Sequence, residues 1–99
     1  MDFVNTSRQI GEHRDEILRL ATRHGAGNVR IFGSVARGEE TPESDVDFLI
    51  DVTGETTPRF PGSLAADLEL LLGRRVQVVI RRSLSHLIRD EVLREAVPL

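Results

Sequence analysis

The chain has 99 residues, no cysteine and a formal net charge of −3 at pH 7. Such a length allows one small domain with a single modest core, so residues 1–99 are expected to form one domain. The absence of cysteine excludes disulfides and thiolate zinc sites, and the acidic balance gives no support for direct nucleic-acid binding. The N-terminus is polar and the apolar runs are too short to cross a bilayer, so we expect a cytoplasmic protein without a membrane span.

The first predicted element is a helix from Thr6 to His24, where apolar residues recur at helical spacing between charged ones. Gly25 and Gly27 are expected to end this helix, since glycine readily adopts a positive φ. His13 and His24 are expected to face solvent, because neither has a second ligand four residues further on with which to bind a metal. The helix residues expected to face the core are Ile10, Ile17, Leu18, Leu20 and Ala21.

A short strand is predicted from Asn28 to Phe32, followed by Gly33-Ser34 and a helical first turn over residues 35–38. Gly33 has no Cβ, so a phosphate can approach its backbone without a side-chain clash. The N–H groups of the helix start, the Ser34 hydroxyl and the Arg37 guanidinium can all point at one anion. These three residues are therefore candidates for phosphate binding.

The second strand is predicted from Val46 to Val52, with apolar residues on one face. Asp45 and Asp47 are two residues apart, so both carboxylates leave the opposite face. Two carboxylates facing a phosphate-binding turn are what Mg²⁺ and a nucleoside triphosphate require together. Asp51 shares that face but lies roughly 13 Å beyond Asp47 at strand rise, so it is not expected to reach the same metal.

Each part of this pattern also has a purely structural explanation. A Gly-Ser before a helix is often a cap, and a Ser-Asp before a strand is often a turn. Arg37 either contacts phosphate or pairs with Glu39 or Glu40 at the surface, and the sequence favours neither. Both fragments together, at this interval and beside predicted strands, favour a nucleotide and metal site.

The second half of the chain begins with a predicted loop over residues 53–61, which is rich in Gly, Thr and Pro. Ser63 is the expected N-cap of a helix from Leu64 to Leu72, and Gly73 is expected to end it. The apolar stripe of this helix comprises Leu64, Leu68, Leu71 and Leu72.

A third strand is predicted from Arg75 to Ile80, followed by a helix that Ser83 caps and that runs to about Ala96 before Pro98. Three strands and three helices in this order predict an α/β (α+β) fold, a small mixed sheet with helices packed on one face. The other face, which carries the carboxylates, is expected to stay partly open to substrate. The residues that the last helix should bury are Leu84, Leu87, Ile88 and Val92.

The spacing of the candidate site residues resembles the signature of polymerase-β-like nucleotidyltransferases. Gly33-Ser34 is followed by ten residues and then Asp45-x-Asp47, in the sequence GSVARGE…SDVDFLID. The likeness runs from about residue 17 to residue 97, and it is greatest to the minimal nucleotidyltransferases, which include the antitoxins of HEPN/MNT toxin–antitoxin pairs. The resemblance implies a polymerase-β-like core in which Gly33 and Ser34 hold the distal phosphates of ATP, and Asp45 and Asp47 bind Mg²⁺.

One residue departs from the pattern of this superfamily. Its members usually carry a third Asp on the strand beside the Asp-x-Asp strand, which helps to bind the metal and takes the proton from the attacking hydroxyl. The matching position here is Gln77, in Val76-Gln77-Val78-Val79. An amide cannot accept that proton or bring negative charge to a cation, and loss of a positioned base costs about 10²–10⁴ in rate.

Two functions of different classes follow. The leading one is a Mg-dependent nucleotidyltransferase that moves AMP from ATP to a hydroxyl acceptor; in the antitoxin branch that it resembles, the acceptor is a tyrosine of a partner HEPN toxin. The alternative is a nucleotide-binding pseudoenzyme that neutralises its partner by contact alone, which Gln77 favours. A nucleotide-binding subunit of an unrelated assembly is a third option. The chain has no room for a substrate domain, so the acceptor site is expected to depend on a partner or on another copy of the chain.

Overall fold

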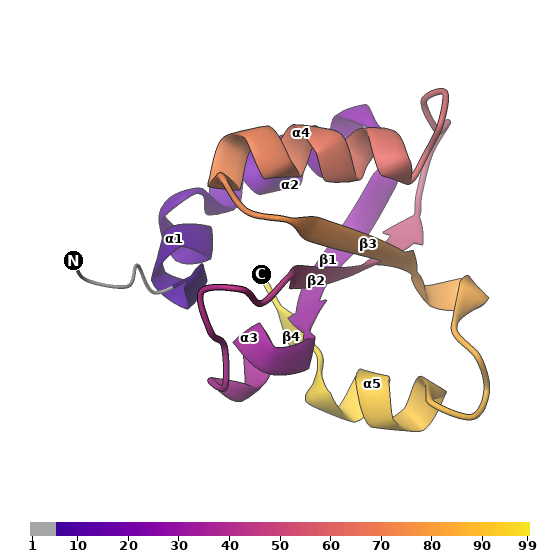
Figure 1. Ribbon diagram of the computed structural model, residues 1–99. Coiled ribbons are helices and arrows are strands. Elements are labelled where there is room, and N and C mark those ends of the chain that lie inside the picture. The colour runs from indigo at the N-terminus through magenta and orange to yellow at the C-terminus, as the bar shows by residue number, and fades with distance from the viewer. Residues whose placement is uncertain (1–5) are drawn as a thin grey trace.

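The structure is a computed structural model that describes residues 6–99 (Figure 1). The single domain predicted over residues 1–99 also includes residues 1–5, which lie outside the described part. The predicted fold class is confirmed, because the described residues form a small mixed sheet with the strand order β3-β2-β1-β4. Antiparallel pairing joins β1 to β2 and β1 to β4, while β3 runs parallel to β2. The strand bounds are Ala26–Phe32 for β1, Val46–Val52 for β2, Val76–Ile80 for β3 and Val97–Pro98 for β4.

The N-terminal region forms two helices where one was predicted. Helix α1 spans Thr6–Glu12 and α2 spans Arg14–Arg23, with a break at His13. Gly11 weakens the helix just before this break, since glycine is a poor helix former. No helix within the described residues is long and apolar enough to cross a membrane.

The prediction that His24 faces solvent is wrong. His24 is buried, with an exposed fraction of 6%, because the loop after β2 folds back over the end of α2. One ring nitrogen hydrogen-bonds with Thr57 Oγ1, and the other lies 2.7 Å from Asp67 Oδ2. Satisfied polar partners of this kind allow a histidine to be buried. His13 is partly exposed and pairs with Glu16.

The end of α2 was predicted correctly only in part. Gly25 has a φ of +85°, as expected, but Gly27 belongs to β1. The positive φ falls instead on Asn28, and the β1–β2 register shifts between Gly27 and Arg30. A bulge of this kind lets the strand begin two residues earlier than its alternation indicated.

Helix α4 spans Gly62–Leu72, so it begins before the residue predicted to cap it. Ser63 is not a cap, and its hydroxyl oxygen instead lies 3.1 Å from Thr57 Oγ1. Gly73 ends the helix in the left-handed conformation, as expected.

The last predicted helix is much shorter than expected. A 3₁₀ turn, η1, spans Arg81–Ser83, and α5 spans only Arg89–Glu95. The chain between them turns at Ser85, whose carbonyl accepts hydrogen bonds from the backbone N–H groups of Ile88 and Arg89. As a result Leu87 and Ile88 are exposed, against expectation, while Leu84 and Val92 are buried. Strand β4 was not predicted, because two residues show no alternation.

The sheet has apolar clusters on both faces. On one face, β2 residues pack against α1, α2 and α4, and the buried β2 members are Val46, Phe48 and Ile50. On the opposite face, Leu49 packs against Leu84 and against Val92 of α5. Asp47 and Leu49 share this second face because alternate residues of a strand point the same way. Helix α5 therefore covers part of the face that carries the carboxylates, so the helices do not all pack on one face, contrary to what was predicted.

Candidate functional site

The predicted site residues meet where β1 ends and α3, Gly33–Arg37, begins. In the sheet register, Asp47 of β2 lies between Phe32 of β1 and Gln77 of β3. Because Gly33 follows Phe32 directly, the glycine turn lies beside the Asp47 side chain. Two segments separated by a polar loop are thus brought together by the β1–β2 pairing.

Gly33 is required by the backbone and by its neighbour. It has a φ of +76°, where residues other than glycine are strained, and a Cβ at this position would collide with Asp47 Oδ2. From the sequence, we expected Gly33 to let a phosphate approach the backbone. The structure adds that the chain's own carboxylate already lies against it.

This collision leads to a stability prediction. We expect Gly33→Ala to lower the free energy of unfolding by about 1–2 kcal/mol for the backbone conformation, plus the cost of displacing Asp47. Gly38→Ala is the matched control, because Gly38 has a φ of +72° but open space around its Cβ position. Urea unfolding of both variants measures the difference, and equal losses would show that Asp47 does not press on Gly33.

Asp45 and Asp47 form a carboxylate pair with unequal surroundings. Asp45 is exposed, and its Oδ1 lies 3.0 Å from Arg75 Nε. Asp47 is partly buried, and its pKa is raised by burial first and then by the charges of Asp45 and Glu95. A cation at this point would relieve the repulsion between the carboxylates.

The donor set suits Mg²⁺ bound together with a nucleotide. Carboxylate oxygens are hard ligands, and Mg²⁺ is commonly held by one or two of them together with substrate phosphates. Over residues 6–99, no three His, Cys, Asp or Glu side chains are grouped so that they could hold an ion. The oxygens of a bound phosphate would therefore complete the coordination.

Gln77 is exposed and directly opposite Asp47 in the parallel β2–β3 register. Paired residues on adjacent strands point to the same face, so the amide is on the same face of the sheet as Asp47, where alternation placed it. Asp51 is engaged elsewhere: its Oδ1 accepts a hydrogen bond from Arg30 Nη2 at 3.0 Å, and its Oδ2 accepts one from Asn28 at 2.8 Å.

Arg37 makes two ion pairs, of which only one was anticipated. Its Nε lies 2.7 Å from Glu39 Oε1, and its Nη1 lies 2.9 Å from Glu95 Oε2. The other predicted surface partner, Glu40, lies instead near Arg74. The backbone N–H of Gly33 also donates a hydrogen bond to Glu95 Oε1. Ser34 is partly buried in the first turn of α3.

Sequence reasoning missed Glu95 entirely. It is the last residue of α5, 62 positions from Gly33 along the chain. No spacing signal connects residues so far apart. Only the packing of α5 against the carboxylate face of the sheet brings it to the glycine turn.

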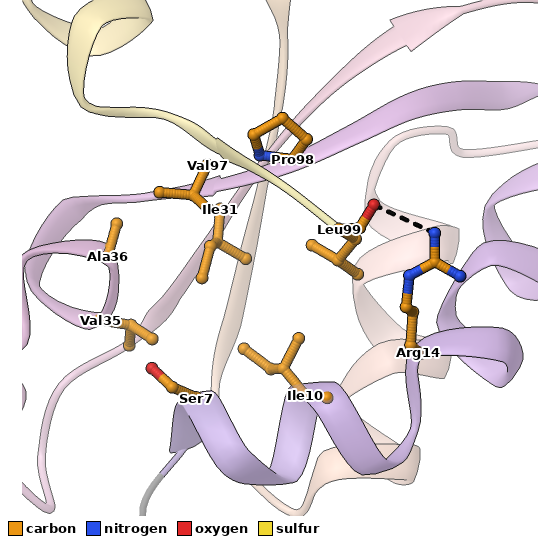
Figure 2. A pocket seen from close by; sticks show the side chains of 10 residues that line it. Ser7, Ile10, Arg14, Ile31, Val35, Ala36, Val97, Pro98 and Leu99 are labelled. Atoms are coloured by element: carbon orange, nitrogen blue, oxygen red, sulfur yellow. Dashed lines mark hydrogen bonds between the residues drawn. The ribbon is translucent and has the colours of Figure 1, made fainter.

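A cavity of about 370 Å³ lies on a different side of α3, between α1, β1 and β4 (Figure 2). Its lining is mostly apolar, and Arg14 donates a hydrogen bond to the Leu99 carbonyl at its edge. None of the carboxylates or the glycine of the candidate site lines it. The lining residues are Ser7, Ile10, Gly11, Arg14, Ile31, Val35, Ala36, Val97, Pro98 and Leu99.

The sequence matches the model of the nucleotidyltransferase domain family over residues 10–99. It is 41% identical over 80 residues to the protein adenylyltransferase MntA of Thermococcus cleftensis, covering 79% of each chain. It is also 34% identical over 88 residues to a Methanocaldococcus jannaschii protein assigned to the protein adenylyltransferases, covering 89% of this chain and 95% of the relative.

Solved structures show the same architecture. A protein classed as a minimal nucleotidyltransferase superposes with a TM-score of 0.81 at 44% sequence identity, covering 93% of this chain and 94% of the other. A toxin–antitoxin structure with AMP-PNP superposes with a TM-score of 0.72 at 22% identity, covering 85% of this chain and 69% of the other. The latter likeness concerns the fold alone.

Proposed function

Because the chain belongs to the nucleotidyltransferase domain family, we propose that it transfers AMP from ATP to a hydroxyl group of a partner protein, with Mg²⁺ as cofactor. The observation that carries this proposal is the contact between the Gly33 backbone position and the Asp47 carboxylate. This contact brings together the turn that we propose binds phosphate and the side chain that we propose binds the metal ion. The relatives assigned to the protein adenylyltransferases support a protein acceptor.

In this proposal Gly33 and Ser34 hold the distal phosphates, and Asp45 and Asp47 hold the metal ion. Mg²⁺ held there would neutralise negative charge on the phosphates, and transfer of AMP to the acceptor hydroxyl would release pyrophosphate. The missing Cβ of Gly33 leaves room for the Asp47 carboxylate at the turn, and the Gly33 N–H becomes available to a phosphate oxygen once Glu95 moves away. Arg37 lies one helical turn further on and can exchange a carboxylate partner for a phosphate.

We further propose that the acceptor is a tyrosine of a HEPN-type toxin, and that the chain acts as its antitoxin. The family resemblance supports this partner, and the relative named MntA, a protein adenylyltransferase, supports transfer to a protein. A small helical ribonuclease-like protein encoded beside this chain would be the partner to test. The alternative is a pseudoenzyme that silences the toxin by contact alone, and the observation that favours it is the Gln77 amide opposite Asp47.

The binding part of the proposal has a direct test. Calorimetric titration of ATP should show an affinity about 10-fold or more higher with Mg²⁺ than with EDTA, because a Mg²⁺ ion held by the carboxylates would attract the phosphates. Asp51→Asn is the matched control: it removes one carboxylate from the same strand, outside the site, and should keep the Mg²⁺ effect. Equal ATP affinities with Mg²⁺ and with EDTA would contradict a metal–nucleotide site.

A further inference from the structure

Glu95 accepts hydrogen bonds from two of the groups that the proposed nucleotide site offers to a phosphate, the Gly33 N–H and the Arg37 guanidinium. Its Oε1 accepts a hydrogen bond from the Gly33 N–H, and its Oε2 accepts one from Arg37 Nη1 at 2.9 Å. We propose that Glu95 is an internal anion that occupies the phosphate-binding turn and has to leave when a triphosphate binds. The inference rests on the proposed function and adds to it a residue that sets the affinity for nucleotide.

The fold holds this carboxylate in place. Helix α5 is anchored by Val92, Leu93 and Ala96, which pack in the cluster around Leu49. The residues after Glu95 continue into β4, which pairs with β1 just before the glycine turn. The Glu95 side chain is only 19% exposed. Its position is fixed by the packing of α5 before it and by the β4–β1 pairing after it.

A phosphate and the Glu95 carboxylate cannot both accept the same Gly33 N–H. They would also repel each other, since both are negative and Asp47 already adds a charge nearby. A role for Glu95 as the missing third metal ligand has no support in the geometry, since the described residues hold no group of three metal-binding side chains. Competition with the triphosphate is the role that its two hydrogen bonds support.

Competition of this kind lowers the apparent affinity for nucleotide. Only molecules whose turn is free of Glu95 can bind the nucleotide, so the smaller this fraction is, the weaker the apparent affinity. Removing the internal anion should therefore strengthen nucleotide binding. Because the two hydrogen bonds involve a charged acceptor, we expect the gain to be about 3- to 30-fold. A residue with a purely structural or metal-binding role would weaken nucleotide binding when replaced.

The experiment measures Mg–ATP affinity by calorimetry for the wild-type chain, Glu95→Gln and Glu95→Ala. Glu91→Gln is the matched control, because Glu91 is an exposed carboxylate one turn earlier on α5. Inorganic triphosphate in EDTA serves as a second probe that needs no metal. Glu95→Gln preserves the shape of the side chain, and thermal unfolding checks that each variant folds.

We expect both Glu95 variants to bind Mg–ATP and triphosphate about 3- to 30-fold more tightly than wild type, with Glu91→Gln unchanged. If the wild type binds Mg–ATP but the folded Glu95 variants bind equally or more weakly, the competition is refuted while the nucleotide site stands. If neither the wild type nor any variant binds Mg–ATP or triphosphate, the proposed function fails and the inference falls with it.

Discussion

Asp47→Asn is expected to reduce AMP transfer by about 10²–10³, the usual cost of removing one group that stabilises charge in the transition state. Asp47 is the carboxylate that lies against Gly33, whereas Asp45 is exposed and pairs with Arg75. An amide in its place has no charge with which to hold a metal ion. The Mg²⁺ effect on ATP affinity should disappear in the same variant. Asp51→Asn is the control, and transfer at the wild-type rate by Asp47→Asn would remove Asp47 from the site.

The raised pKa of Asp47 adds a pH dependence to this expectation. Burial, then Asp45 and then Glu95 raise the pKa, so the protonated form persists to a higher pH than in an ordinary Asp. Mg–ATP affinity should therefore weaken on acidification at a higher pH than an unperturbed carboxylate would give. In the metal-free protein the sign for stability is opposite: the native state binds the proton more tightly, so stability falls as pH rises from the unfolded pKa through the raised folded pKa.

A consequence is that Asp47→Asn should make the metal-free protein more stable at neutral pH, although it impairs transfer. The substitution removes a charge that is partly buried and repelled by its neighbours. Thermal unfolding of the wild type and Asp47→Asn in EDTA measures this gain. A lower melting temperature for Asp47→Asn would contradict the electrostatic description of the site.

Gln77→Asp is expected to increase AMP transfer by about 10²–10⁴, the range for a positioned general base. The register places the new carboxylate opposite Asp47 on the same face. The metal-free variant should be less stable than wild type through like-charge repulsion, and Mg²⁺ should restore stability by binding the native state. Gln77→Asn is the matched control, since it has the same length as Asp without its charge. If the wild type already transfers as fast as Gln77→Asp, another residue acts as the base.

Local patterns predicted the part of the site that lies on β1, α3 and β2. The conformational freedom of Gly33 and the alternation of Asp45 and Asp47 depend on neighbouring residues alone. The structure brings Asp47 against Gly33, and Asp45 lies just before β2, where it pairs with Arg75. The face of Gln77 also follows from alternation, and the parallel register then puts it opposite Asp47.

Contacts between distant segments could not be predicted in the same way. His24 is buried because a loop more than 30 residues away supplies Thr57 as a partner, and polar residues at the end of a helix give no sign of this. Glu95 reaches Gly33 only because α5 packs on the second face of the sheet. The last predicted helix starts late, at Arg89, because the chain turns at Ser85, which the apolar spacing around Leu87 concealed.

The measurement that tests the central claim most directly is the intact mass of the proposed partner toxin after incubation with the wild-type chain, ATP and Mg²⁺. The account predicts that the toxin gains the mass of one AMP group on a tyrosine, that EDTA or Asp47→Asn suppresses this gain, and that Gln77→Asp accelerates it. A toxin that is bound and silenced but keeps its original mass, with the wild type and with Gln77→Asp alike, would contradict transfer and leave neutralisation by contact alone.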